Sequence, residues 1–356
     1  MNILFVFKED NTNGGAASIL RQVIEYYISH GSIVHVVFLK EKKWGHFDSI
    51  ACDNLKLYFG GSLAKILHNF SVVNKINFDY SYNSVVKFTG LVGVLKRLGF
   101  LHINTMVGRE STSIFLRFKG LRLLYYNLWY RLGYKAANII ICQSDVMKKQ
   151  FIEHLPWIEK YAKVVVIPNP VNMDRMNEMA KEDIDVTPFH PYIITAGRMI
   201  NEKAYDILLD AYATVLKLFP KLKLVILGDG ILRPQIEQQI ANLGVGDRVH
   251  LAGQVPNVYP WFKRATLCVV SSRMEGFPNV LLQMMSQNDR VVSTLCAGGI
   301  EKINGLFTCP INDSVALAQS MLDCLESDTI GKRLLFDQEL NNRSIDNFIR
   351  IVEKSK

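Results

Sequence analysis

The feature that most constrains the fold is a regular alternation of short apolar runs with longer segments of helical period. The apolar runs are rich in Val, Ile, Leu and Phe, and they recur along the whole chain. This pattern is typical of a parallel β-sheet covered by helices on both faces, because strands buried on both faces read as continuous apolar runs. In such sheets, ligands bind beyond the carboxyl ends of the strands.

The runs form two successive sets, each sufficient for its own sheet. In the first set the expected strands are residues 3–7, 33–39, 55–59, 80–83, 103–107, 139–142 and 164–167, and the expected helices are residues 16–30, 62–76, 88–98, 121–134 and 146–154. In the second set the expected strands are residues 192–196, 223–227, 249–252, 267–270 and 290–293, and the expected helices are residues 203–218, 232–243, 258–264, 279–287 and 315–326. We therefore predict an α/β protein with two doubly wound, Rossmann-like domains that face each other across a cleft.

The length of 356 residues also favours two domains, since single cores rarely grow beyond about 250–300 residues. A polar stretch, residues 172–190, is expected to be a hinge between a first domain at 1–171 and a second at 191–340. Residues 341–356 are expected to pack back on the first domain. Two facing domains with one ligand on each wall suit a protein that joins two substrates.

Composition excludes several classes of protein. A hydrophobic content of 49% with 21% charged residues is that of a soluble globular chain. The sequence contains no apolar run near the roughly 20 residues that cross a bilayer, and residues 1–7 are too short for a signal peptide. The six cysteines include no C-x-x-C pair, which favours reduced thiols in the cytosol over a disulfide framework or a zinc site.

Positive charge is concentrated in the first half of the chain. Residues 1–170 hold 21 Lys and Arg against 11 Asp and Glu, whereas the remainder holds 20 against 22. The excess indicates an anionic partner, and a nucleic acid ranks last because no binding motif for one is present. Residues 115–135 mix cations with aromatic and aliphatic side chains. They are expected either to lie on an anionic membrane surface or to pack as an ordinary helix on the first sheet.

Glycines follow the first expected strand in the run 13–18, Asn-Gly-Gly-Ala-Ala-Ser. Gly14 and Gly15 would let the backbone approach a ligand closely, and free amides at the start of the next helix would attract an anion. The run lacks the dinucleotide pattern G-x-G-x-x-G. A plain turn between strand and helix is an equally good interpretation.

Two cations follow the first expected strand of the second domain, Arg198 beside Gly197 and then Lys203. Arg can bond phosphate oxygens through two N–H groups and Lys adds a compact charge, so both could converge on one diphosphate. Two solvated loop charges are the alternative. Gly228 follows the next strand and suits a sharp turn.

The strongest signal is the run from Arg273 to Gln283, which follows the apolar strand at 267–270. Pro278 and Asn279 suit a helix start, and the amides from Gly276 to Val280 would bind a pyrophosphate without a metal. Glu275 lies in the loop and Gln283 about one turn into the helix. One of these two side chains can reach the sugar of a nucleotide sugar while the other reaches the ribose hydroxyls.

With these motifs the chain resembles the family 4 glycosyltransferases, which are retaining enzymes of the two-domain GT-B fold. The matching motifs occur in the family's order: Gly14-Gly15, Ile167-Pro168-Asn169-Pro170-Val171, Gly197-Arg198 with Lys203, Gly228-Asp229-Gly230, Gly253 and Glu275-Gly276-Phe277-Pro278-Asn279. The Phe-Pro-Asn-Val variant, with Ser293-Thr294 downstream, is similar to the branch that builds bacterial capsule, O-antigen and lipopolysaccharide.

The resemblance implies that Arg198 and Lys203 bind the donor diphosphate and that Glu275 contacts the transferred sugar, so these three are the expected catalytic residues. The expected donor-binding residues are Gly15, Gly197, Arg198, Lys203, Gly228, Gln254, Glu275, Gly276, Phe277, Pro278, Asn279, Val280 and Gln283. The family usually has a carboxylate at the position of Gln283. An amide can still bond a ribose hydroxyl, but without the charge that strengthens the bond.

In the first domain, the resemblance points to Gly14, Gly15, Arg109 and Glu110 for acceptor or sugar contacts. A salt bridge from Arg109 or Glu110 to the second domain is the alternative. Asp183-Ile184-Asp185 matches the metal-binding D-x-D pattern of another glycosyltransferase fold, but it lies in the expected hinge. We therefore expect neither a metal nor a cofactor.

The resemblance implies transfer of a hexose or N-acetylhexosamine from a nucleotide-diphosphate sugar, with UDP favoured, to a hydroxyl of a lipid-linked or oligosaccharide acceptor. This reaction belongs to bacterial surface glycan synthesis, and it implies a cytoplasmic enzyme peripheral at the inner face of the cell membrane. Two alternatives stay open. One is a nucleotide-sugar epimerase of the same architecture, and the other is a non-catalytic sugar-nucleotide-binding subunit.

Overall fold

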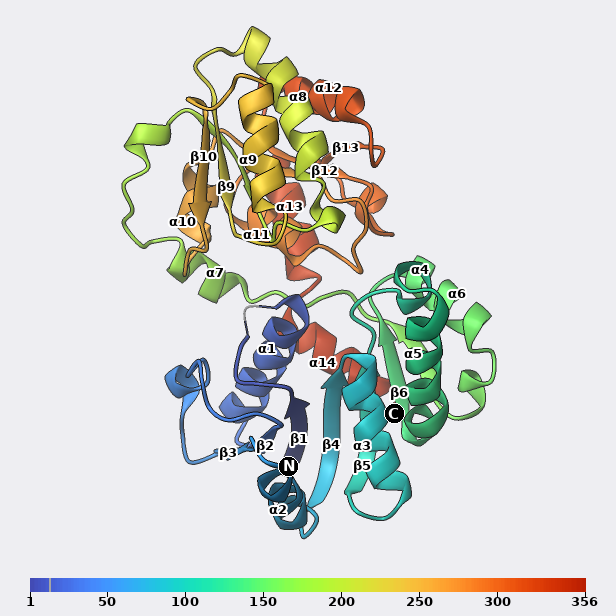
Figure 1. Ribbon diagram of the computed structural model, residues 1–356. Coiled ribbons are helices and arrows are strands. Elements are labelled where there is room, and N and C mark those ends of the chain that lie inside the picture. The colour runs from blue at the N-terminus through green and yellow to red at the C-terminus, as the bar shows by residue number, and fades with distance from the viewer. Residues whose placement is uncertain (13) are drawn as a thin grey trace. The chain divides into compact units, whose positions relative to one another are not determined.

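A computed structural model describes residues 1–12 and 14–356, so Asn13 of the expected glycine turn lies outside the described residues. The chain divides into two compact units (Figure 1). The first comprises Met1–Pro170 together with Ile345–Lys356, and the second comprises Val171–Ser344. Each unit is built around one sheet in which all paired strands run parallel.

The sheet of the first unit has the strand order β3-β2-β1-β4-β5-β6-β7. Its strands are β1 (Asn2–Phe7), β2 (Ile33–Phe38), β3 (Leu55–Phe59), β4 (Asn77–Ser84), β5 (His102–Arg109), β6 (Ile139–Cys142) and β7 (Lys163–Val166). Its helices are α1 (Gly15–Ser29), α2 (Leu63–Val73), α3 (Val86–Arg97), α4 (Ile114–Arg117), α5 (Gly120–Gly133), α6 (Asp145–His154) and α14 (Ile345–Lys354). The strand order reverses between β1 and β4, which is where a doubly wound sheet binds ligands.

Strand β1 shows why apolar runs form the centre of this unit. Ile3, Phe5 and Phe7 pack in the cluster that contains α1 and α14, whereas Leu4 and Val6 pack in a second cluster with α2 and α3. Because side chains alternate between the two faces of a strand, a strand with helices on both sides must be apolar at every position. The continuous run that predicted a doubly covered strand is explained by this packing.

The end of the chain returns to the first unit as α14, which packs beside α1 (Figure 1). Phe348, Ile349 and Val352 bury one face of this helix in the core that β1 shares. The backbone N–H of Val171 donates to the carbonyl oxygen of Arg343 at 2.8 Å. The outgoing and returning segments of the chain therefore run side by side.

The sheet of the second unit has the strand order β10-β9-β8-β11-β12-β13. Its strands are β8 (Tyr192–Ala196), β9 (Lys223–Leu227), β10 (Val249–Gly253), β11 (Leu267–Val270), β12 (Val291–Thr294) and β13 (Phe307–Cys309). Its helices are α7 (Met173–Met179), α8 (Tyr205–Leu218), α9 (Arg233–Asn242), α10 (Tyr259–Arg264), α11 (Asn279–Gln287), α12 (Ser314–Glu326) and α13 (Lys332–Asn341). Here the order reverses between β8 and β11.

Residues 172–190, which we expected to form a hinge, contain α7 and belong to the second unit. The Asn172 side chain caps this helix by accepting the Arg175 backbone N–H at 2.9 Å. Met176, Ala180 and Val186 are buried in the core of the second unit. The few apolar residues of this segment lie among polar ones, so its sequence shows no clear helical period. The sequence therefore did not predict this helix.

Candidate functional site

Strands β8 and β11 are neighbours at the point where the strand order of the second unit reverses. Two segments that lie far apart in the sequence therefore meet at their carboxyl ends, one after Ala196 and one after Val270. The Ser271 hydroxyl donates to the carbonyl oxygen of Lys203 at 2.8 Å, which joins the two segments. A small pocket between them has Lys203, Ser272 and Val280 among its walls.

An ion pair between Lys203 and Glu275 is the centre of this site. The Lys203 Nζ atom lies 2.6 Å from Glu275 Oε1, and the two side chains are only 18% and 21% exposed. The Ser272 hydroxyl donates to the same carboxylate oxygen at 3.1 Å, and the Glu275 backbone N–H donates to the carbonyl of Cys296 at 2.9 Å. The structure thus brings together two of the three expected catalytic residues and holds one carboxylate oxygen, Oε1, by two side chains.

Close packing of glycines shapes the adjacent loops. Gly228 has φ +126°, and a Cβ added there would overlap the carbonyl oxygen of Gly197. The Gly228 backbone N–H donates to the carbonyl of Gly253 at 2.6 Å, and the Gly197 N–H donates to that of Leu227 at 2.9 Å. Larger residues would push these strand ends apart, so glycine is needed here for close approach as well as for the turn.

Arg198 is exposed beside these glycines, and among the residues that the structure describes its guanidinium has no ion pair. Arg273 differs, because its guanidinium lies 2.5 Å from Asp206 Oδ2 and donates to the Asn201 carbonyl at 2.7 Å. Arg198 is therefore available to an incoming anion, whereas Arg273 fixes the loop that precedes α8. The cation that contacts the Glu275 carboxylate is Lys203.

The start of α11 supplies the amides expected to meet a pyrophosphate. The helix begins at Asn279 after Pro278, and within the described chain no side chain caps this end. Backbone N–H groups at a helix start carry partial positive charge and favour anions. The Phe277 ring, in contrast, is buried in the core under the Arg343 guanidinium, 4.5 Å from the ring centroid, so only its backbone can face a ligand.

Gln283, at the position where the family usually has a carboxylate, donates from Nε2 to the Tyr259 hydroxyl at 3.3 Å. Tyr259 is buried, which raises the pKa of its hydroxyl. Gln254 is exposed just after β10. Gln283 therefore lies in α11 and contacts α10, whereas Gln254 follows a strand.

In the first unit, Arg109 and Glu110 lie at the carboxyl end of β5 and are both buried. The two Glu110 carboxylate oxygens accept the hydroxyls of Tyr134 at 2.6 Å and Tyr130 at 2.8 Å. Burial raises the pKa of Glu110 to about 7, against the lowering effect of these bonds and of Arg109. Inside its own unit, this carboxylate is enclosed rather than presented to solvent.

The Arg109 guanidinium donates from Nη2 to Asn169 Oδ1 at 2.5 Å, and burial lowers its pKa to about 10. Its Nε and Nη1 atoms are buried without a hydrogen-bond partner in the described residues. A guanidinium in this state strongly favours an acceptor or anion that can reach it. Asn169 belongs to the Pro168-Asn169-Pro170 motif, so two parts of the sequence resemblance meet here.

Gly14 and Gly15 lie where β1 leads into α1, Gly14 as the N-cap with φ −81° and Gly15 as the first helical residue. Neither glycine needs a left-handed backbone. Among the described residues, no atom beyond the neighbouring residues in the chain lies within 4 Å of a Cβ built on Gly14. Gly14 therefore leaves open space beside the start of α1, and its backbone is not strained.

Sequence reasoning missed several residues that hold the site together. Tyr205 is buried, which raises the pKa of its hydroxyl, and it donates to the Gly197 carbonyl at 2.8 Å. Thr294 donates to the carbonyl of Ser272 at 2.6 Å. Both side chains donate to backbone carbonyl oxygens of loops that follow strands. No local pattern in the sequence indicates which carbonyl they reach.

Within residues 1–12 and 14–356, no cluster of three or more His, Cys, Asp or Glu side chains is arranged to hold a metal ion. The helices of the described chain are all too short or too polar to pass through a bilayer. The five buried cysteines are free thiols whose pKa values are raised by burial, and Cys52 is free and exposed.

The structure defines an α/β architecture of two units, each built on one parallel sheet. A crystal structure of Anabaena HepE in complex with UDP superposes on the whole chain with a TM-score of 0.78 and 17% identity, and the match covers 99% of that chain. At this identity the likeness shows the fold alone, which is the GT-B fold that the sequence predicted. Residues 190–327 match the family described as Glycosyl transferases group 1.

Relatives with similar sequences are also named as glycosyltransferases. An uncharacterized glycosyltransferase of Methanocaldococcus jannaschii is 30% identical over 49% of this chain and 44% of its own length. A Campylobacter jejuni N-acetylgalactosamine-N,N'-diacetylbacillosaminyl-diphospho-undecaprenol 4-alpha-N-acetylgalactosaminyltransferase is 26% identical over 56% of this chain and 54% of its own length. The chain thus spans about half the length of these relatives. The predicted resemblance to GT-B glycosyltransferases is confirmed.

Proposed function

We propose that this chain is a glycosyltransferase that takes its sugar from a nucleotide-diphosphate donor held by the second unit. The observation that carries the proposal is the pair of Lys203 Nζ and Glu275 Oε1, 2.6 Å apart at the point where β8 and β11 reverse the strand order. A cation for the diphosphate and a carboxylate for sugar hydroxyls stand side by side there. The match of residues 190–327 to the group 1 family lies over this same unit.

UDP is the proposed nucleotide, and a hexose or N-acetylhexosamine the proposed sugar. Support comes from the HepE structure, whose name records UDP, and from the Campylobacter jejuni relative, which is named for transfer of N-acetylgalactosamine. In the donor site of this chain, Arg198, Lys203 and the amides at the start of α11 would meet the diphosphate. Gln283 would meet the ribose, and Glu275 the sugar.

The acceptor is proposed to be a hydroxyl of a lipid-linked or polysaccharide glycan in bacterial surface glycan synthesis, at the cytoplasmic side of the membrane. The name of the Campylobacter jejuni relative includes diphospho-undecaprenol, a lipid carrier. Within the first unit, the groups proposed to contact acceptor or sugar are the open turn at Gly14 and Gly15 and the Arg109 nitrogens that have no hydrogen-bond partner among the described residues.

The proposed reaction is a metal-free transfer with retention of configuration. The acceptor oxygen forms a bond to the anomeric carbon on the face from which the diphosphate departs. The anomeric carbon–oxygen bond breaks, its electron pair stays on the diphosphate, and the proton of the acceptor hydroxyl passes to a diphosphate oxygen. Arg198 and Lys203 stabilise the charge that grows on the leaving group, and removing one such group typically lowers the rate by about 10²–10³.

The test starts with the thermal stability of the protein in the presence of a panel of nucleotide sugars. A donor at 100 times its Kd should stabilise the protein by about 2.7 kcal/mol. The stabilising donor is then incubated with and without a lipid-linked acceptor, with Arg198→Ala and Lys203→Ala beside the unchanged protein. We expect transfer only with acceptor, and its loss in both variants.

Three other outcomes would contradict the proposal. Isomerisation of the donor without acceptor would instead support the epimerase alternative. Donor binding without transfer to any acceptor would support a binding subunit. Unimpaired transfer by Lys203→Ala would show that Lys203 does not bind the donor diphosphate, and the proposed donor site would lose its support.

A further inference from the structure

Helix α5 carries leucines on the face that it turns to solvent. Leu121, Leu124, Tyr125, Leu128 and Leu132 are all exposed, with Leu121 85% and Leu128 53% accessible. At 100° per residue these positions form a single stripe along the helix. The opposite face, with Tyr130 and Gly133, is buried against the sheet and α3. A water-exposed helix normally carries polar residues on its outer face.

The inner face of α5 is fixed tightly enough that the leucine stripe cannot turn inward. A Cβ on Gly93 of α3 would overlap the carbonyl of Gly133, and one on Gly133 would overlap that of Gly90, so the two helices are in backbone contact. Tyr130 adds its hydrogen bond to the buried carboxylate of Glu110. The exposed stripe is therefore a permanent feature of the folded unit.

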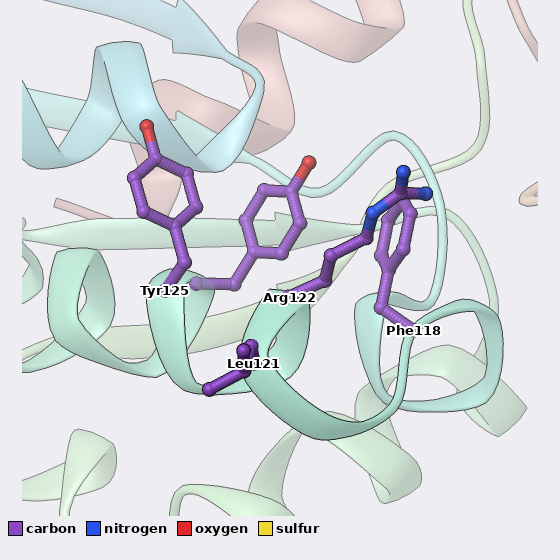
Figure 2. Close-up of a pocket in the computed structure, with 5 residues that line it drawn as sticks. Phe118, Leu121, Arg122 and Tyr125 are labelled. Carbon is purple, nitrogen blue, oxygen red and sulfur yellow. The ribbon is translucent and has the colours of Figure 1, made fainter.

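Cations border the stripe, and the surrounding sequence has no exposed acidic residue. Arg122 and Arg131 lie on opposite sides of the leucines and are exposed, as is Lys135 just beyond the helix. From residue 80 to residue 144 the sequence has nine Lys and Arg, and the buried Glu110 is its only acidic residue. At the start of α5, an open hollow is lined by Phe118, Leu121, Arg122, Tyr125 and Tyr126 (Figure 2).

We propose that this α5 face, the stripe from Leu121 to Leu132 with Arg122 and Arg131, docks on an anionic phospholipid bilayer. Leucines and tyrosine would enter the boundary between headgroups and acyl chains, while the flanking guanidinium groups meet lipid phosphates. A second copy of the chain is the other occupant that an apolar face could have. Two such faces would bring arginines against arginines, and residues 80–144 supply no exposed carboxylate to pair them, so charge disfavours it.

Docking of this kind would keep the proposed enzyme at the surface where a lipid-linked acceptor is found. The docking surface consists of α5 and its neighbours in the first unit. It does not depend on the donor site of the second unit, so the two proposals can fail separately.

The test is sedimentation of the whole chain with vesicles of phosphatidylcholine alone and of phosphatidylcholine with phosphatidylglycerol. We expect binding to the anionic vesicles only. Each cation near an anionic surface contributes about a fivefold gain in partitioning, so Arg122→Gln with Arg131→Gln should weaken binding roughly 25-fold. Leu121→Gln with Leu128→Gln should weaken it by roughly tenfold or more.

A matched control is available on α2 of the same unit. Leu63 and Leu67 are 72% and 61% exposed, so Leu63→Gln with Leu67→Gln removes the same chemistry at another surface and should leave vesicle binding unchanged. Thermal stabilisation by UDP, measured on every variant, reports the fold and the donor site. Its loss with vesicle binding intact would contradict the proposed function and leave the α5 face standing.

Equal binding to neutral and anionic vesicles, or binding that survives both α5 double substitutions, would overturn the proposal. The proposal would also be overturned if the protein did not bind vesicles but formed a concentration-dependent dimer, and if Leu121→Gln with Leu128→Gln dissociated that dimer. That result would assign the face to a second copy of the chain.

Discussion

Replacing Glu275 by Gln should strengthen the binding of UDP even though it weakens sugar transfer. Glu275 Oε1 lies 2.6 Å from Lys203 Nζ, and both side chains are about four-fifths buried. The proposed diphosphate must take Lys203 away from this carboxylate. An ion pair of this exposure contributes about 1 kcal/mol, so removing the competing charge should tighten UDP about fivefold.

The opposite effect is expected for Lys203→Ala. A hydrogen bond to a charged group contributes about 1.5–3 kcal/mol, so UDP should bind roughly 10- to 150-fold more weakly. Isothermal titration of UDP into each variant measures both changes, and transfer assays should show both variants impaired. Glu178→Gln serves as the control, because Glu178 pairs with Lys181 at 2.5 Å on the exposed surface of the same unit.

The sign of the Glu275 effect decides between two roles for the pair. If Glu275→Gln weakened UDP as much as Lys203→Ala does, the ion pair would be a scaffold that shapes the pocket, and the competition between carboxylate and diphosphate would be refuted. Ser272 also bonds Glu275 at 3.1 Å, and it can donate to a glutamine oxygen equally well. The local structure should therefore survive the substitution.

Three further predictions concern other positions. Gly228→Ala should destabilise the fold by at least about 2 kcal/mol in urea denaturation, because its Cβ meets the Gly197 carbonyl at φ +126°; unchanged stability would contradict the close approach. The raised pKa of Glu110, about 7 against 4.5, means that the native state binds more protons between these values, so stability falls as pH rises from about 4.5 to 7. This loss in the free energy of unfolding is on the order of 3 kcal/mol, and Glu110→Gln should reduce it. If the free energy of unfolding changed between pH 5 and pH 7 by the same amount in the variant, the prediction would be refuted. Gln283→Glu should tighten UDP a few-fold by restoring a charged acceptor to the ribose, measured by titration, whereas weaker binding would place the ribose elsewhere.

Much of the fold could be predicted from sequence because the strands are buried on both faces. Every position of β1 from Ile3 to Phe7 is apolar, and so the run was visible without an alternating pattern. Strand β13 and helix α13 were missed. The strand Phe307–Cys309 has only three residues, and α13 buries little beyond Phe336 and Leu340, so neither gives a strong period.

The site was predictable in its parts but not in its pairings. Gly197 and Lys203 stood out because they follow a strand, and Glu275 because it follows another. That Lys203 contacts Glu275 depends on β8 lying next to β11, which is a property of the strand order and not of either segment. The burial of Arg109 and Glu110 was hidden for the same reason, since Tyr130 and Tyr134 reach the carboxylate from a helix 20 residues and more along the chain.

Both units place a cation and a carboxylate close together at the carboxyl end of a strand, but their surroundings give them different chemistry. Glu275 is partly exposed and held by a lysine, so an incoming anion can exchange with it. Glu110 is enclosed by two tyrosine hydroxyls, and two nitrogen atoms of the neighbouring Arg109, Nε and Nη1, have no hydrogen-bond partner among the described residues. A charge that can change partners suits a substrate that must bind and leave. A buried cation suits a hydrogen-bond donor whose direction must stay fixed. We therefore propose that Lys203 and Glu275 exchange partners when a substrate binds, and that Arg109 donates in one fixed orientation.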